Sequence, residues 1–437
     1  MSAELLQRLL EGRLTDPESG AAVVVPTRTV EIAPTLRGGE ASLIESLDLG
    51  RRLAIIADPT TWQVLGARVS GALAPHFAVA PLILPEHPHA DMETVQRIRA
   101  VTRLADGLVA IGSGTINDLT KYAAYLDQKP YACFATAPSM NGYTSVNAAI
   151  MEGGIKKSLP AAAARGVFID VGILLKAPRR MIAAGFGDSI CRATAQADWL
   201  LAHLLLDQPY RALPFALLME DETALLAAPE ALISGDASAM TRLARLLVMS
   251  GFGMTICGGS YPASQGEHLI AHFLEMRGDP AAASFHGEQI AVTTLTMARI
   301  QGEMLRSEKP RLAPPTVTAA TLAAFYGSEV GAACWQSLGR KLPMGERLSA
   351  VNRRLEQNWS EIRQSIRAVH RSATVLESAL RRCGAPTRSA DLGLSEAVYR
   401  EAVLHAREVR DRYTFLDFAA DTGVLAALVG ESPVPAQ

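Results

Sequence analysis

The hydrophobic pattern divides the chain into two parts that differ in period. As far as residue 178, short apolar runs alternate with helix-like segments, and the runs are Leu53–Ala57, Ala80–Leu84, Gly107–Ile111, Tyr131–Ala135 and Gly166–Asp170. Most of these runs lack polar alternation, which is typical of strands covered on both faces. Pro81 weakens the case for the second run, because proline cannot donate to a sheet ladder.

Helical patterns connect the runs and then dominate the rest of the chain. Thr61–Leu73 and Ala90–Arg103 carry apolar residues at three- and four-residue steps. After Pro178 the sequence is rich in Ala, Leu, Arg and Glu, with helical patterns such as Met240–Met249, Ser360–Val369 and Ser395–Arg410. The alternation of strands and helices predicts a parallel α/β domain over residues 1–178. The helical patterns that follow predict an all-α domain over residues 179–437.

Composition narrows the class of protein. With 437 residues the chain has room for two domains, and its net charge of −2 provides no basic field for nucleic acid or an anionic membrane. Its apolar runs are too short to span a bilayer, and Met1–Gly20 lacks the apolar core of a signal peptide. The scattered cysteines, without a CxxC pair, favour reduced thiols in the cytoplasm over a disulfide scaffold or a cysteine-built zinc site: Cys133, Cys191, Cys257, Cys334 and Cys383.

A glycine-rich turn, Gly112–Asp118, directly follows the run that ends at Ile111. Glycines allow close backbone approach, and the start of the next helix offers free N–H groups to a phosphate. The alternative is local: Thr115 could be an N-cap, with Asp118 as the acid of a capping box. The residues alone leave both interpretations open.

Two further strand ends carry polar residues. Thr136–Ser145 follows Tyr131–Ala135, and its hydroxyls could bind a nucleotide or a polyol, or serve a local turn. Asp58 follows Leu53–Ala57, where an acid can accept hydrogen bonds from an adenosine ribose, although an Asp-Pro turn before a helix is the commoner arrangement.

Three of the nine histidines lie in one short window of the second part. His268 and His272 are four residues apart, so a helix places both on one face, and His286 follows a loop. Upstream, Asp188 stands near the start of a helical run, where a helix N-cap is the plainer role for it. Two imidazoles and a carboxylate would suit a catalytic zinc, iron or similar divalent ion.

Taken together, these residues resemble the family that unites iron-type alcohol dehydrogenases, glycerol dehydrogenase and 3-dehydroquinate synthase. The similarity runs from about Asp58 to Leu425, and within the family it is greatest to bacterial sn-glycerol-1-phosphate dehydrogenases. The segments that carry it are Gly112–Asp118, Thr136–Ser145, Ala184–Asp188, Gly266–His272, His286–Glu288 and Arg410–Asp417. The resemblance implies a dehydroquinate synthase-like fold, in which an NAD-binding α/β domain precedes a helical domain that binds metal and substrate.

The resemblance also implies roles for individual residues. Asp188, His268 and His286 correspond to the metal ligands, and His272 to a histidine near the substrate that is not a ligand, so Asp188 and His272 become the catalytic candidates. Asp58 corresponds to an acid associated with NAD preference over NADP. The remaining cofactor-binding candidates are Gly114, Thr115, Ile116, Asn117, Asp118, Thr136, Ala137, Pro138, Ser139 and Ser145.

One position departs from the family. The substrate loop usually carries Asp before the glycine that here is Gly142, and this chain has Asn141. A carboxylate offers two acceptor oxygens, whereas an amide offers one acceptor and one donor group. We therefore expect Asn141, Asp188 and His272 to contact the substrate, with the polyol held differently or replaced by a related one. Lys121, Lys156, Lys157 and Arg192 are candidates for its phosphate, although for each a solvated surface cation is the simpler reading.

The resulting expectation is a cytoplasmic, metal-dependent oxidoreductase that interconverts dihydroxyacetone phosphate and sn-glycerol 1-phosphate or a closely related polyol phosphate. It would use NAD(H) or NADP(H) and one divalent metal (Zn, Ni or Fe). Its partners would be the phosphorylated polyol or ketone and further copies of itself, with no nucleic acid and no membrane insertion. The alternatives are a sugar-phosphate cyclase resembling 3-dehydroquinate synthase, which has Glu where Asp188 stands, and a non-catalytic binding protein, which only Asn141 supports.

Overall fold

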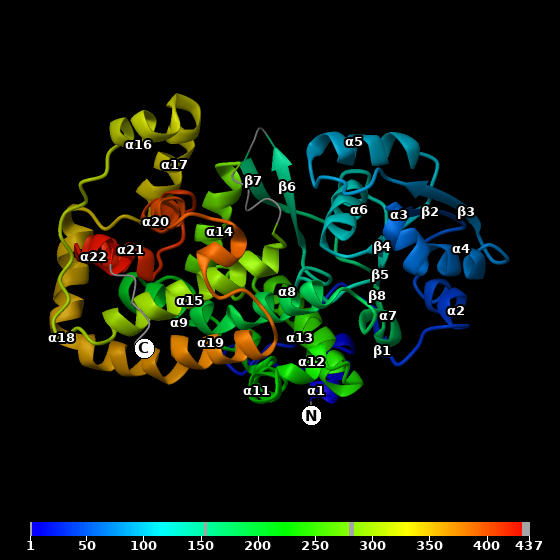
Figure 1. Cartoon of the computed structure of the whole chain (residues 1–437), viewed down its shortest axis with the longest axis horizontal. Helices are drawn as coiled ribbons and strands as arrows, with labels where there is room; N and C mark the ends of the chain where they lie inside the picture. Colours follow the sequence, from blue (N-terminus) through cyan, green and yellow to red (C-terminus); the bar gives the residue numbers. More distant parts are fainter. Residues whose placement is uncertain (1, 153–154, 279–283, 431–437) are drawn as a thin grey trace. The chain divides into compact units, whose positions relative to one another are not determined.

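The first half of the chain forms a parallel sheet covered by helices. The computed structural model describes residues 2–152, 155–278 and 284–430. Six strands pair in the order β1-β8-β5-β4-β2-β3, all in parallel (Figure 1). Their bounds are β1 Thr29–Ala33, β2 Arg52–Ala57, β3 Ala78–Ile83, β4 Gly107–Gly112, β5 Tyr131–Ala135 and β8 Gly166–Asp170. A separate antiparallel hairpin joins β6 (Asn147–Glu152) to β7 (Ile155–Pro160).

The five predicted strands are confirmed, with their ends shifted by at most a few residues. Strands β4, β5 and β8 are buried along their whole length, as their uninterrupted apolar runs indicate. Strand β3 contains Pro81 and lies at the edge of the sheet, beside β2 alone. An edge strand tolerates proline because one side of its backbone needs no ladder partner.

Helices connect and cover the strands. In this part they are α1 Ser2–Leu10, α2 Glu40–Glu45, α3 Pro59–Thr61, the π-helical turn η1 Trp62–Gly66, α4 Ala67–Leu73, α5 Met92–Val101, α6 Gly114–Leu126, α7 Val171–Leu174 and α8 Arg179–Ile190. The predicted helix Thr61–Leu73 is therefore present as η1 and α4, and Ala90–Arg103 as α5. Helix α6 packs against β4 and β5, and α4 against β3. One apolar core, which includes Ile55, Val109 and Phe134, lies on this sheet.

Beyond α8 the described residues contain helices and no strand. They are α9 Arg192–Leu206, α10 Leu213–Ala216, α11 Met219–Ala227, α12 Glu230–Ile233, α13 Ala237–Ile256, α14 Gly266–Met276, α15 His286–Met304, α16 Ala319–Tyr326, α17 Ser328–Lys341, α18 Gly345–Val369, α19 Ala373–Arg382, η3 Ser389–Leu392, α20 Glu396–His405, η4 Ala406–Glu408, α21 Phe415–Asp421 and α22 Leu425–Gly430. The α/β-then-α fold class is confirmed. Among the described helices, none has the length and apolarity needed to cross a bilayer.

Packing divides the chain into two compact units. The first is Met1–Ser189 with Arg211–Ser260 and Arg382–Ala385, and the second is Ile190–Tyr210 with Tyr261–Arg381 and Pro386–Gln437. The sequence pattern instead places the boundary at residue 178 and assigns 211–260 to the helical part. These residues join the first unit because α13 packs against β1 and α7. Close approach fixes that packing: a Cβ on Gly251 of α13 would meet Thr144 Oγ1 at 2.2 Å.

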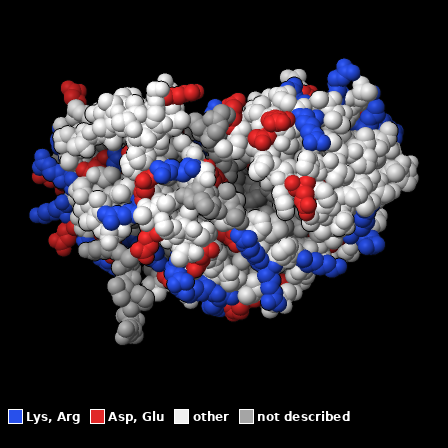
Figure 2. Space-filling view, turned by 45° about the horizontal axis from the view of Figure 1, so that its top comes forward, with Lys and Arg blue, Asp and Glu red and all other residues white. Residues whose placement is uncertain are grey.

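The second unit has its own core, and charges are mixed on the surface. The core cluster includes Leu269 and Phe273 of α14, Trp359 of α18 and Phe418 of α21. On the face seen in Figure 2, Lys and Arg side chains alternate with Asp and Glu, and no broad field of one sign is visible. That mixture agrees with the near-zero net charge of the sequence.

Candidate active site

The glycine-rich turn leads from β4 into α6 without a side-chain cap. Ser113 occupies the N-cap position and makes no side-chain cap bond, while Thr115 lies inside the helix. The capping-box interpretation of Thr115 and Asp118 is therefore wrong, and Asp118 Oδ2 instead accepts from the backbone N–H of Ala149 at 3.0 Å. A glycine is required at position 112 for steric reasons, because a Cβ there would lie 2.5 Å from Ile116 Cβ. An uncapped helix start after a close turn suits a phosphate group.

The second strand-end stretch is fixed by contacts on both sides. Thr136 N–H donates to Gly112 O at 3.1 Å, which joins the two strand-end turns. Tyr143 Oη donates to Ala137 O at 2.6 Å. On the other side, helix α8 lies so close that a Cβ on Gly185 would stand 1.5 Å from Pro138 O. The backbone of Thr136–Ser139 is therefore held in one position before any ligand binds.

Lys121 anchors the loop that follows. Its ammonium group is buried and donates to Gly142 O at 2.6 Å, Ser145 Oγ at 3.1 Å and Asn147 O at 3.0 Å. Burial lowers the pKa of Lys121. The side chain is thus neither a surface cation nor open to a substrate phosphate. Ser145 Oγ also donates within the loop, so a cofactor role for Ser145 stays a prediction.

Asp58 is the N-cap of α3. Its Oδ1 accepts from Thr61 N–H at 2.7 Å and from Thr61 Oγ1 at 3.0 Å. The Asp-Pro turn that the sequence offers as the plainer interpretation is therefore present. The side chain still stands at the carboxyl end of β2, so a role in choosing between NAD and NADP stays a prediction.

Asp188 lies near the end of α8 and is only 1% exposed. The expectation that it stands near the start of a helical run, where it could be an N-cap, is wrong, because α8 begins at Arg179. The backbone N–H of Asn141 donates to its Oδ2 at 2.9 Å. The substrate-loop position singled out in the sequence therefore orients this carboxylate. Buried Asn141 Nδ2 has no hydrogen-bond partner among the described residues, which leaves a donor for a ligand.

Helix α14 carries His268 and His272 on one face, as their spacing predicts. Their ring centroids lie 6.1 Å apart. The start of the helix is held by Asp198, whose Oδ2 accepts from Gly266 N–H at 2.9 Å. Gly266 is needed there, because a Cβ would come within 2.8 Å of the same oxygen and 2.4 Å of Met297 Cε.

Glu267 is a functional candidate that the sequence analysis misses. Its Oε1 lies 2.9 Å from His268 Nδ1 and also accepts from Gln265 N–H at 2.7 Å. Its other oxygen accepts from Thr194 Oγ1 at 3.2 Å. Burial, followed by the charge of His286, lowers the pKa of His268 well below its usual value. The imidazole is therefore neutral, and a hydrogen on Nδ1 bonded to Glu267 leaves Nε2 with a lone pair.

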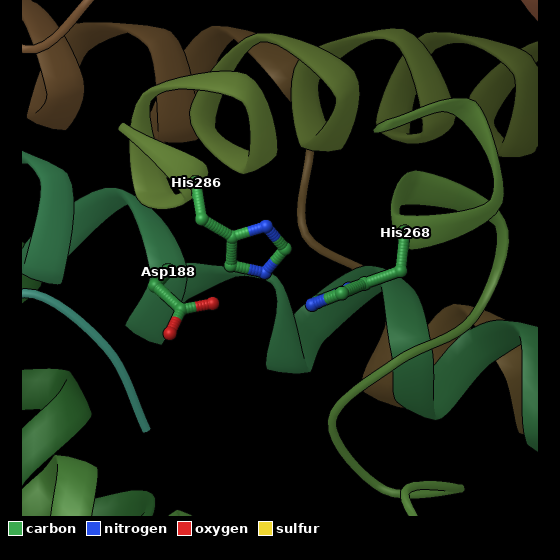
Figure 3. Close-up of side chains that lie close together, drawn as sticks. All are labelled: Asp188, His268 and His286. Atoms are coloured by element: carbon green, nitrogen blue, oxygen red, sulfur yellow. The ribbon is translucent and has the colours of Figure 1, made fainter. Parts of the chain in front are cut away.

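His286 completes the group. It is the first residue of α15, whose start is closed by Glu288 Oε2 accepting from Phe285 N–H at 2.8 Å. Asp188, His268 and His286 each offer an atom, and these atoms all lie within 4.8 Å of one another. Figure 3 shows the carboxylate and the two rings turned toward one another. Cys191, Glu267 and His268 form a second such group, which shares His268.

Comparisons with known proteins agree on the family. Residues 31–178 match the family model described as iron-containing alcohol dehydrogenase. The chain is 32% identical to glycerol-1-phosphate dehydrogenase [NAD(P)+] of Pyrococcus furiosus over 282 residues, 63% of this chain and 80% of the relative. It is 27% identical to the protein of the same name from Bacillus licheniformis over 390 residues, 88% of this chain and 86% of the relative.

Solved structures confirm the fold at lower identity. Maleylacetate reductase from Agrobacterium tumefaciens superimposes with a TM-score of 0.62 at 15% identity, over 93% of this chain and 96% of that one. Glycerol dehydrogenase from Schizosaccharomyces pombe gives 0.61 at 13% identity, over 92% and 90%. These solved structures show the fold, and the sequence relatives show the family. The chain belongs to the glycerol-1-phosphate dehydrogenase family.

Proposed function

We propose that this protein is a metal-dependent, NAD(P)-linked dehydrogenase that interconverts dihydroxyacetone phosphate and sn-glycerol 1-phosphate. The observation that carries the proposal is the group Asp188, His268 and His286, whose donor atoms lie within 4.8 Å of one another. The names of the relatives supply the substrate and the cofactor.

The three side chains fit a divalent metal by their chemistry. A neutral imidazole with its second nitrogen on a carboxylate is the usual form of a metal-binding histidine, and His268 has that form. One carboxylate and two imidazoles leave coordination positions open, which is the pattern of a catalytic site for zinc, nickel or iron. When bound, such a metal would act as a Lewis acid toward the substrate oxygens.

Residues of the chain itself account for the other requirements. Asn141 N–H holds Asp188 in place, and Glu267 fixes the orientation of His268. His272 is one turn along α14 from His268, and we assign to it the transfer of the proton at the substrate hydroxyl. Asn141 Nδ2 is a donor for a substrate oxygen, where the family's usual Asp would be an acceptor.

The two strand-end stretches would bind the dinucleotide. The uncapped start of α6, Gly114–Asp118, would receive its pyrophosphate, with Thr136–Ser139 beside it through the Thr136–Gly112 bond. Asp58 would favour NAD over NADP. All five cysteines are free of disulfides, which supports a reducing cytoplasmic compartment. The expected homo-oligomer stays a prediction.

The test is an NADH oxidation assay on chelator-treated protein with dihydroxyacetone phosphate. We expect activity to fall about 100-fold or more on chelation and to return with Zn²⁺, Ni²⁺ or Fe²⁺, with one NADH consumed for each ketone reduced. A cyclase would convert its substrate with no net change in NADH. Full activity after complete metal removal, or no NADH consumption with any metal, would refute the proposal.

A further inference from the structure

Two arginines of the segment Arg410–Asp417 have no part in the function described so far. Arg412 is 7% exposed, its Nη1 donates to Ser264 O, and its Cζ lies 4.6 Å from the centre of the Tyr261 ring. Arg410 is partly buried, with Nη1 3.4 Å from Ser264 Oγ. Both guanidinium groups therefore reach the short stretch that precedes helix α14.

Both guanidinium groups lie at the start of the helix that carries His268, because Ser264 stands two residues before α14. Burial lowers the pKa of Arg410 and, together with the charge of Arg410, lowers that of Arg412 to about 9. Two cations that lie close together, one buried and one partly buried, are unfavourable unless an anion accompanies them.

Two nearby carboxylates act on these arginines through their charge: that of Asp411 partly offsets the fall in the pKa of both, and that of Glu267 does so for Arg412. Asp411 lies between the two arginines in sequence, but its side chain is 54% exposed and 3.8 Å from Arg340 Nη1. Glu267 accepts from Gln265 N–H and lies against His268 Nδ1. Among the residues that the structure describes, no carboxylate oxygen stands within 4.0 Å of the Arg410 guanidinium.

Arg407, three residues earlier, shows what a neutralised buried arginine looks like here. Its Nη1 lies 2.9 Å from Asp421 Oδ1, and its Nε 3.5 Å from Asp417 Oδ1. Two arginines only three residues apart thus differ: Arg407 is buried and paired with two acids, and Arg410 is partly buried and paired with no acid among the described residues. The difference indicates that the close ion-pair partner of Arg410 comes from outside the chain.

We infer that Arg410, with Arg412 as a second positive charge, binds the phosphate group of the substrate at the start of helix α14. The inference rests on the proposed function, which supplies a phosphate monoester as the substrate. A guanidinium group matches phosphate oxygens in a two-pronged geometry, and its charge is permanent. Two of the lysines considered from the sequence are poorer candidates, because Lys121 is buried in loop contacts and Lys157 pairs with Glu152 at 2.7 Å. The side chain of Lys156 lies outside the described part of the chain.

The first experiment compares two substrates on one variant. In Arg410→Ala we expect kcat/KM for dihydroxyacetone phosphate to fall about 10- to 100-fold, mainly through KM, because charge-assisted hydrogen bonds are lost. For unphosphorylated dihydroxyacetone it should change less than about twofold. Arg277→Ala, which removes an arginine exposed at the end of α14 and paired with Glu401, is the matched control and should affect neither substrate. An equal fall for both ketones would overturn the inference.

A second measurement does not depend on turnover. Calorimetric titration with inorganic phosphate should detect binding to the wild type and a loss of about tenfold or more in affinity in Arg410→Ala. Equal affinity in the two proteins would overturn the inference. If Arg410→Ala does not fold, Arg410→Lys replaces it, with a smaller fall in the same direction. Should the wild type reduce neither ketone, the proposed function fails, and the phosphate titration alone decides the role of Arg410.

Discussion

The strand-end turns of the first unit and the histidine helix of the second are built in opposite ways. In the turns, the charged side chains are already satisfied by the chain: Lys121 makes three contacts, and Asp58 caps its own helix. In α14, a neutral buried imidazole at His268 is held by Glu267 through one nitrogen and keeps a lone pair on the other.

The strand-end turns are therefore defined by their shape, and the histidine helix by the chemistry of its side chains. Glycines and close packing fix the turns, so a ligand there meets a preformed surface of backbone donors. Electrostatics fixes the histidine group, since burial keeps His268 uncharged and Glu267 selects which nitrogen is exposed. Mutations in the first region should therefore act on stability and cofactor choice, and those in the second on metal binding and turnover.

The largest change expected in the histidine helix is the fall in kcat on His272→Ala. If His272 transfers the proton, kcat should fall about 10³-fold while the metal content stays at the wild-type level. Steady-state kinetics together with elemental analysis of the protein measures both. His203→Ala on α9 is the control and should leave kcat unchanged, because that exposed ring contacts Gln208 O. A His272→Ala protein that loses its metal would instead be a ligand variant.

Gly185→Ala should damage the preformed turn. The added Cβ would stand 1.5 Å from Pro138 O, so either α8 or the Thr136–Ser139 backbone must move. We expect the free energy of unfolding to fall by about 3 kcal/mol, as measured by chemical denaturation. Gly71→Ala is the matched control, since a Cβ on this glycine of α4 meets nothing within 4 Å. It should raise stability by up to about 1 kcal/mol through helix propensity. Equal stability changes would show that the contact is not tight.

Glu267→Gln should act on the metal rather than on the fold. The amide can still accept a hydrogen bond from His268 but carries no charge, so the basicity of the imidazole falls. We expect metal affinity to drop about 10- to 100-fold by calorimetric titration. Glu303→Gln, at an acid exposed in α15 beside Arg306, serves as the control. Unchanged affinity in Glu267→Gln would remove the orienting role of the carboxylate.

Asp58→Asn gives the smallest expected change. It removes a negative charge at the end of β2 while keeping an acceptor for the cap, so the ratio of kcat/KM for NADPH to that for NADH should rise up to about tenfold. Asp91→Asn changes an equivalent N-cap, whose side chain accepts from Thr94 N–H at 2.8 Å. A ratio that rises equally in both variants would mean that the cap and not the cofactor explains the effect.

Much of the fold follows from the sequence because the signals are local. The uninterrupted runs of β4, β5 and β8 mark strands buried on both faces, and the alternation with helices marks a parallel sheet. Strand β1 escapes detection because all five of its residues are only partly buried and its pattern is mixed. The β6–β7 hairpin also escapes, although Gly153-Gly154 between two alternating runs is a hairpin signal that the sequence contains.

The candidate site could be predicted only in part, because only some of its features have a local signal in the sequence. The spacing of His268 and His272 predicts their shared face, but a hydrogen bond between residues 47 positions apart, Asn141 and Asp188, has no local signal. The packing of α13 on β1 and α7 likewise depends on tertiary contacts. The change to helical patterns at Pro178 therefore does not coincide with the edge of a compact unit. Glu267 carries a weak signal, as an acid directly before the histidine.

The central claim is that Asp188, His268 and His286 bind one divalent metal. The most direct test is the metal content of purified wild type, Asp188→Asn, His268→Ala and His286→Ala, measured by elemental mass spectrometry beside circular dichroism to confirm folding. The account predicts about one ion per chain in the wild type and a small fraction of that in each folded variant. Wild-type metal content in all three variants would contradict it.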